Sequence, residues 1–168
     1  MNGNSQEFAI EFHLTEKLDD YWYGNLCFWI GGSRVGNFNE ISTITISVSF
    51  LKDFIIKKPY RQFDSSPALS KEYLFYQLYK KFFLSESIKD QSYLELGNIR
   101  EIFWLDEVGE YSFRDKIGMI LIDEPELKRQ RFIWQMLDND FIFEYFISLD
   151  HFEVVANEFI KTVDKEVG

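Results

Sequence analysis

The chain has 168 residues, of which 28 are Asp or Glu and 18 are Lys or Arg, so its formal net charge is −10. This charge repels phosphate groups and argues against broad nucleic-acid binding. A single cysteine, Cys27, excludes an internal disulfide framework and fits a reducing compartment. No apolar run approaches the ~18 residues of a membrane span, and the first residues lack a secretory-signal pattern. We therefore expect a cytoplasmic protein that does not bind nucleic acid or a membrane.

The N-terminal third of the chain reads as β-structure. Apolar and polar residues alternate from Glu7 to Leu14, which predicts a half-exposed strand. The apolar run 26–30 is followed by Gly31-Gly32 and a second β-prone run, which predicts a tight hairpin. The glycine spacing also resembles the start of a phosphate-binding loop, but Asn37 stands where that loop needs its lysine.

The next two segments read as helices. Residues 43–56 fit both a strand and a helix, and their length favours a helix with Ser42 or Thr43 as N-cap. Ser66-Pro67 has the form of an N-cap followed by a first-turn proline, which predicts a helix from Ser66 to Leu84.

The remainder predicts strands followed by one helix. Strands are expected at Ile99–Leu105, Gly118–Ile122 and Lys128–Leu137, with a short one at Phe141–Ile147. The last helix is expected to start at Asp150, with Glu153 completing a capping box. The order of elements predicts one α+β domain over residues 1–168, with a largely antiparallel sheet and two or three helices packed on it.

The charge is unevenly distributed along the chain. Residues 51–90 carry +3, whereas residues 91–126 carry −6. The acidic clusters fall at predicted strand ends or turns, so several are expected on one edge of the sheet, where they would attract a cationic partner. Simple solvation of charged loops is the alternative. Aromatic residues beside the acids, with Tyr93 and Phe113 among them, are candidate anchors. The partner-binding candidates are Trp22, Asp106, Glu107, Glu110, Tyr111, Asp123, Glu124, Glu126, Asp138 and Asp140.

The sequence contains little that predicts catalysis. His13 and His151 lack neighbours at metal-ligand spacing, and Cys27 lies in an apolar run. Glu126 and Lys128 form a Glu-x-Lys pattern that could serve a metal-dependent hydrolase with an upstream Asp115 or Asp106. Because this pattern is short and lies in an acidic field, we expect a protein that is not an enzyme and that binds no cofactor or metal.

The segment from Tyr23 to Phe38, YGNLCFWIGGSRVGNF, resembles the immunity protein 42 family. Members of such families are small bacterial antitoxins encoded beside polymorphic or contact-dependent growth-inhibition toxins. The resemblance covers residues 7–58, and Asn37 stands where the family pattern has Asp. The matched residues belong to the scaffold, so the resemblance transfers no toxin-contacting residue.

The resemblance implies a stoichiometric inhibitor that binds a cognate toxin domain in the cytosol of the producing cell. Many such toxins are nucleases with cationic active sites, which an acidic surface would occlude by mimicking phosphate. The alternatives are the small hydrolase described above and a non-catalytic adaptor or homo-oligomeric protein. The sequence leaves the oligomeric state open.

Overall fold

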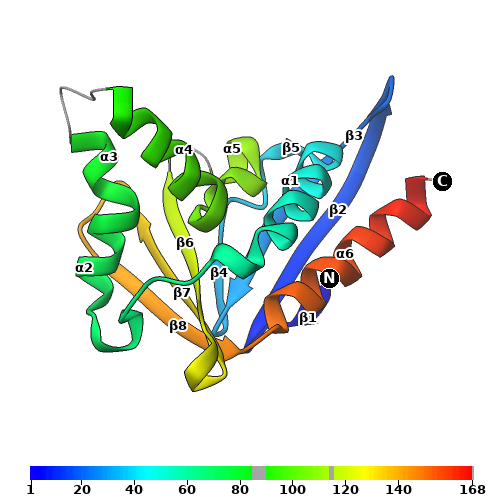
Figure 1. The fold of residues 1–168 in the computed structure, drawn as a ribbon. Helices are drawn as coiled ribbons and strands as arrows, with labels where there is room; N and C mark the ends of the chain where they lie inside the picture. The colour runs from blue at the N-terminus through cyan, green and yellow to red at the C-terminus, as the bar shows by residue number, and fades with distance from the viewer. Residues whose placement is uncertain (85–89, 114–115, 168) are drawn as a thin grey trace.

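A computed structural model describes residues 1–84, 90–113 and 116–167 of the chain (Figure 1). It contains two antiparallel sheets with helices packed against them, so the predicted α+β class is confirmed. The strands form two separate sheets, whereas the sequence pattern predicted one. None of the described helices combines the length and apolar character needed to cross a membrane.

The first sheet comes entirely from the N-terminal quarter of the chain. Its strands are β1 (Asn2–Asn4), β2 (Phe8–Leu18), β3 (Tyr21–Ile30), β4 (Ser33–Val35) and β5 (Ile41–Thr43). They pair in the order β1-β2-β3-β4, and β5 also pairs with β3. The predicted hairpin is confirmed, because Gly31 and Gly32 adopt φ values of 57° and 81° between β3 and β4. Glycine adopts such positive φ values without steric cost because it has no Cβ atom.

The ambiguous segment 43–56 forms a helix, α1 (Ile44–Ile56). Its buried stripe includes Ile44, Val48 and Leu51, which recur at the helical spacing. Thr43 is the N-cap residue, but its hydroxyl donates to Glu110 Oε2 at 2.8 Å and does not cap the helix. Helix α1 packs against β3 and lies between the two sheets (Figure 1).

The second sheet consists of β6 (Ile117–Glu124), β7 (Arg129–Met136) and β8 (Ile142–Ser148), paired in that order. Every residue of β6 is buried, which explains its continuous apolar run. One face packs into the main core through Met119 and Leu121, and the other face packs into a smaller core through Ile120 and Ile122.

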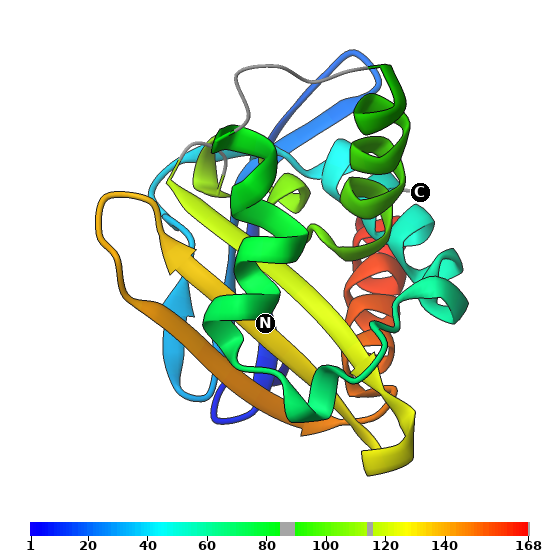
Figure 2. The same cartoon turned by 60° about the vertical axis from the view of Figure 1, so that its left-hand side comes forward.

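The smaller core is closed by a helical segment that lies across the outer face of the second sheet (Figure 2). The segment comprises α2 (Lys71–Phe75), the π-helical segment η3 (Tyr76–Lys80) and α3 (Lys81–Leu84). The predicted start at Ser66 is wrong. The hydroxyl of Ser70 accepts a hydrogen bond from the Tyr73 N–H and caps the helix, whereas Ser66 starts a separate 3₁₀ turn, η2 (Ser66–Ala68).

The predicted strand Ile99–Leu105 is also wrong, because residues 90–103 form helix α4 (Asp90–Phe103). Ile99, Ile102 and Phe103 are spaced at i, i+3 and i+4, so they face the smaller core from one side of a helix. Trp104 contributes only an isolated β-bridge to Ile120. The short helices η4 (Asp106–Val108) and α5 (Glu110–Phe113) complete the connection.

The last described element is helix α6 (His151–Val167), which packs against α1 and β2. Its predicted apolar face is confirmed, since Phe152, Val155, Ala156, Phe159 and Val163 are all buried. The predicted capping box is wrong in its partners. Asp150 adopts a φ of 69°, and the first-turn N–H of Phe152 donates to Oε1 of Gln130 at 2.9 Å.

The hairpin glycine provides a test of this arrangement. A Cβ atom added at Gly31 would lie 2.5 Å from Cδ2 and Cε2 of Tyr145, at a positive φ that disfavours other residues. We expect Gly31→Ala to lower the free energy of unfolding by roughly 1–3 kcal/mol in urea titrations. Gly97→Ala, in α4 with open space around the added atom, should be neutral or stabilise by up to about 1 kcal/mol. Equal effects at the two positions would contradict the hairpin geometry.

Candidate functional site

The predicted acidic residues lie at both ends of the second sheet and do not share one edge. The register pairs Ile117 with Met136 at one end and Glu124 with Arg129 at the other. The eight residues of β6 separate these ends by about 25 Å at roughly 3.3 Å per residue. The two sets of acids therefore occupy different environments and are described in turn.

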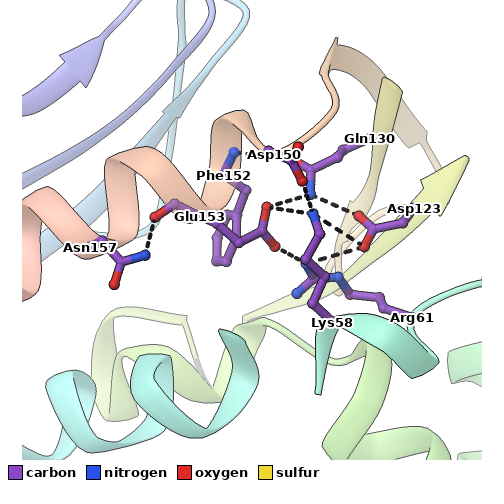
Figure 3. Close-up of polar contacts among 8 residues, drawn as sticks. All are labelled: Lys58, Arg61, Asp123, Gln130, Asp150, Phe152, Glu153 and Asn157. Atoms are coloured by element: carbon purple, nitrogen blue, oxygen red, sulfur yellow. Dashed lines mark hydrogen bonds and ion pairs between the residues drawn. The ribbon is translucent and has the colours of Figure 1, made fainter. Parts of the chain in front are cut away.

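At the Glu124 end, a buried ionic network surrounds Arg61 (Figure 3). The Arg61 side chain is fully buried, and its Nη2 pairs with Asp123 Oδ2 at 3.4 Å and with Glu153 Oε1. The guanidinium lies 4.6 Å from the Phe54 ring centroid and 5.5 Å from that of Phe152. These ring faces give the cation a favourable environment where Nε and Nη1 have no hydrogen-bond partner among the described residues.

Lys58 and Gln130 complete this network. The Lys58 ammonium lies 3.0 Å from Glu153 Oε2, and Gln130 Nε2 donates to both Asp123 and Glu153 at 2.7 and 2.9 Å. Burial raises the pKa of Asp123, and Arg61 only partly offsets that. Burial also disfavours the Glu153 carboxylate, but Arg61 and Lys58 outweigh it and lower the pKa of Glu153. The network joins the turn η1 (Lys58–Tyr60), the second sheet and α6.

Glu124 lies in a second buried network at the same end. It accepts a hydrogen bond from the Ser66 hydroxyl at 3.0 Å and pairs with Arg129 at 2.6 Å. Arg131 lies 3.6 Å from Glu124 and donates to the backbone carbonyls of Ser66 and Leu69. The prediction that Asp123 and Glu124 lie on the partner-binding surface is therefore corrected: both carboxylates are buried and hold the segment 61–70 against the sheet.

The buried guanidinium of Arg61 can be tested by substitution. Arg61→Met leaves Asp123 and Glu153 buried without their main counter-charge, so we expect a loss of about 3–5 kcal/mol in the free energy of unfolding. Lys52→Met breaks the exposed ion pair with Asp164 and should change the free energy of unfolding by less than about 1 kcal/mol. Urea denaturation followed by circular dichroism would measure both. Similar small effects would show that Arg61 is not an internal counter-ion.

At the other end of the sheet, the predicted acids have mixed environments. Asp106 is 6% exposed, and its Oδ2 accepts a hydrogen bond from the Tyr79 hydroxyl at 2.8 Å. Glu107 is half-buried and pairs with Arg100. Glu110 is half-buried and accepts hydrogen bonds from the N–H and hydroxyl of Thr43. Of these three, Asp106 is removed from the outer surface.

The remaining acids are exposed. Asp138 and Asp140 lie in the turn between β7 and β8, and Glu126 lies on the turn η5 (Pro125–Leu127). None of the three forms an ion pair with another described residue. Phe141 and Phe143 are exposed beside the first two acids, on and next to the edge strand β8. We call the group Leu137, Asp138, Asp140, Phe141 and Phe143 the β7–β8 turn surface.

The structure also places the predicted aromatic anchors. Phe113 is fully buried against Phe28, with ring centroids 5.0 Å apart, so its prediction as an interface anchor is wrong. Trp22 is half-buried at the start of β3, and its backbone N–H donates to Thr45 at 2.9 Å. The side chains of Tyr93 and Tyr111 are outside the described part of the structure.

The predicted catalytic alternatives are not assembled among the described residues. Glu126 and Lys128 are exposed on one turn, whereas Asp106 lies near the opposite end of β6, and Asp115 lies outside the described residues. Cys27 is buried 3.5 Å from a Glu11 carboxylate oxygen, and burial together with Glu11 raises the pKa of its thiol to about 12. The thiol therefore stays protonated at neutral pH. Within residues 1–84, 90–113 and 116–167, no group of three or more His, Cys, Asp or Glu side chains could hold a metal ion.

The burial of Asp106 predicts an unusual pH dependence of stability. Burial raises the pKa of Asp106 to about 7 from an ordinary value near 3.8, so the folded state binds this proton more tightly than the unfolded state. Stability from this group is fully present below about pH 4 and is lost as pH rises to 7. At pH 8, the free energy of unfolding of Asp106→Asn should therefore be roughly 1–3 kcal/mol higher than that of the wild type.

Thermal melts between pH 4 and pH 8 would measure this difference. The two proteins should converge at the acidic end of the range. Asp138→Asn, which alters an exposed carboxylate, should follow the wild-type profile throughout. A constant offset between wild type and Asp106→Asn would contradict the predicted titration.

Comparison with known families identifies the class of protein. The family model described as Immunity protein 42 matches residues 1–162, which is nearly the whole chain. The chain therefore belongs to the immunity protein 42 family, and the resemblance at residues 7–58 extends to both sheets and to most of α6. No curated protein and no solved structure is significantly similar to the chain.

Proposed function

We propose that this immunity protein neutralises a cognate toxin by stoichiometric binding in the cytoplasm of the cell that produces both proteins. The observation that carries the proposal is the family match over residues 1–162. The toxin of this proposal belongs to a polymorphic or contact-dependent growth-inhibition system and is a nuclease with a cationic active site. A net charge of −10 suits such a partner, because it raises the rate of encounter.

We place the contact on the β7–β8 turn surface. Asp138 and Asp140 are exposed there without an internal cation among the described residues, unlike Asp123 and Glu124. Phe141 is 75% exposed and Phe143 is 43% exposed, and exposed apolar patches with a polar rim are typical of protein interaction sites. In the proposed complex these acids occupy the phosphate-binding region of the toxin and exclude its substrate.

The proposal is tested with the toxin domain encoded beside this protein. We expect a 1:1 complex whose association rate falls at least about tenfold between 50 and 500 mM salt, because the charges are screened. At 50 mM salt, the double variant Asp138→Asn/Asp140→Asn should associate with the toxin more slowly than the wild type does. Biolayer interferometry would measure the rates.

The matched control carries the same change in charge on another element. Glu158→Gln/Glu166→Gln removes two exposed carboxylates from α6 and should leave the association rate nearly unchanged. Equal slowing by both double variants would assign the effect to net charge and overturn the placement. Absence of a complex with the wild-type protein would overturn the function.

A further inference from the structure

A cavity of about 230 Å³ lies between η3, the end of α4 and the β7–β8 turn. Tyr79, Phe83, Trp104 and Leu137 form its apolar wall, and Arg100, Asp106 and Glu107 supply its polar groups. A second hollow of about 240 Å³ shares Tyr79, Phe83 and Leu137 with it and is almost wholly apolar. Leu137 belongs to the β7–β8 turn surface, so the cavity adjoins the contact proposed above.

The walls of this cavity suit a flat cation. The ring centroids of Tyr79 and Trp104 are 4.4 Å apart, and Phe83 stacks on Trp104 at 5.6 Å. Phe83 is nevertheless 65% exposed, so the aromatic group opens to the surface. The chain's own Arg100 guanidinium already lies 5.8 Å from the Trp104 ring centroid. Aromatic faces attract cations, and guanidinium groups stack on them well.

The carboxylate of Asp106 lines the same cavity and forms no ion pair with another described residue. Its Oδ1 is buried and no described group reaches it with hydrogen-bond geometry, although the backbone N–H groups of Asp106 and Met119 act on the carboxylate; its Oδ2 accepts a hydrogen bond from the Tyr79 hydroxyl. Arg100, the basic residue that lines the cavity, pairs instead with Glu107. A buried carboxylate oxygen without a partner is unfavourable, so a donor entering the cavity would be bound there.

We propose that this cavity receives an arginine side chain of the cognate toxin, with its guanidinium at Asp106 Oδ1 and its aliphatic stem against Phe83 and Leu137. The inference rests on the proposed function and names the anchor of that contact. A planar guanidinium fits both the aromatic walls and the carboxylates of Asp106 and Glu107 better than a compact ammonium does. Acids on the rim would steer the toxin, and the buried acid would retain it.

The titration of Asp106 adds a pH dependence to this geometry. Burial raises its pKa to about 7, with Glu107 adding to the effect, whereas the Tyr79 hydroxyl and the backbone N–H groups of Asp106 and Met119 oppose it. Among the described residues, Glu107 and Tyr79 are the other titratable groups that act on this carboxyl, and Arg100 is the basic residue that lines the same cavity. A bound guanidinium favours the ionised form, so binding should be tighter at pH 8 than at pH 6 and should release a proton at pH 6.

The cavity itself is tested with propylguanidinium as the probe and propylurea as its neutral analogue. Titration of the full chain, followed by nuclear magnetic resonance, should shift the Trp104 indole signal with a Kd on the order of millimolar for the cation. Propylurea should produce no saturable shift. Asp106→Asn should weaken binding of the cation at least about tenfold, whereas Glu158→Gln, which alters an exposed carboxylate on α6, should leave the Kd unchanged.

Three outcomes of this titration would overturn the assignment. They are equal binding of propylurea, an unchanged Kd in Asp106→Asn, or tighter binding of butylammonium than of propylguanidinium. The thermal melts described above establish separately that Asp106→Asn is folded.

The complex with the toxin separates this inference from the proposed function. Asp106→Asn should raise the dissociation rate at least about tenfold and leave the association rate nearly unchanged, because a buried anchor acts after encounter. A wild-type dissociation rate in this variant would overturn the inference and leave the function intact. If the wild-type protein does not bind the toxin, the proposed function is overturned. The toxin is then also excluded as the source of the arginine. The probe titration then still decides whether the cavity binds a guanidinium.

Discussion

The fold depends on neutralising one fully buried guanidinium. Arg61 lies between the rings of Phe54 and Phe152 and pairs with Asp123 and Glu153. These four partners come from α1, α6 and β6, so a single charge connects helices beside the first sheet to the second sheet. A buried ion is costly unless its partners are placed around it, and this requirement specifies how the elements dock.

The internal pairing also changes the meaning of the charge distribution. The basic stretch at 51–90 supplies Lys58 and Arg61 to acids that lie later in the chain. Part of the segregation along the sequence is therefore complementarity within the fold. Internal pairing leaves the net charge unchanged, but it removes particular carboxylates, among them Asp123 and Glu124, from the surface. The exposed acids include Asp138 and Asp140, which lie beside exposed aromatic side chains at the β7–β8 turn. Membership in an immunity protein family underlies our proposal that this surface binds a toxin.

Much of the fold could be predicted where one periodicity dominates. Three patterns each predict a single structure: the alternation from Glu7 predicts a strand, Gly31-Gly32 a hairpin, and the apolar stripe of α6 an amphipathic helix. The structure contains all three. Residues 99–105 fit two periods, because their apolar positions serve a strand or one face of a helix, and the strand prediction was wrong. The start of α2 was misplaced because Ser66 and Ser70 are both plausible caps, and only Ser70 caps a helix.

The sequence by itself determined the α+β class, the hairpin, the family resemblance and an acidic character that disfavours nucleic acid. Only the tertiary structure decided which acids are available to a partner. Asp123 and Asp138 look alike in sequence, since each follows an apolar run at a strand end. One is buried beside Arg61 and the other is exposed. Burial depends on partners that are distant along the chain. The cavity that joins Tyr79, Trp104, Asp106 and Leu137 depends on such partners too, so local sequence patterns cannot predict either feature.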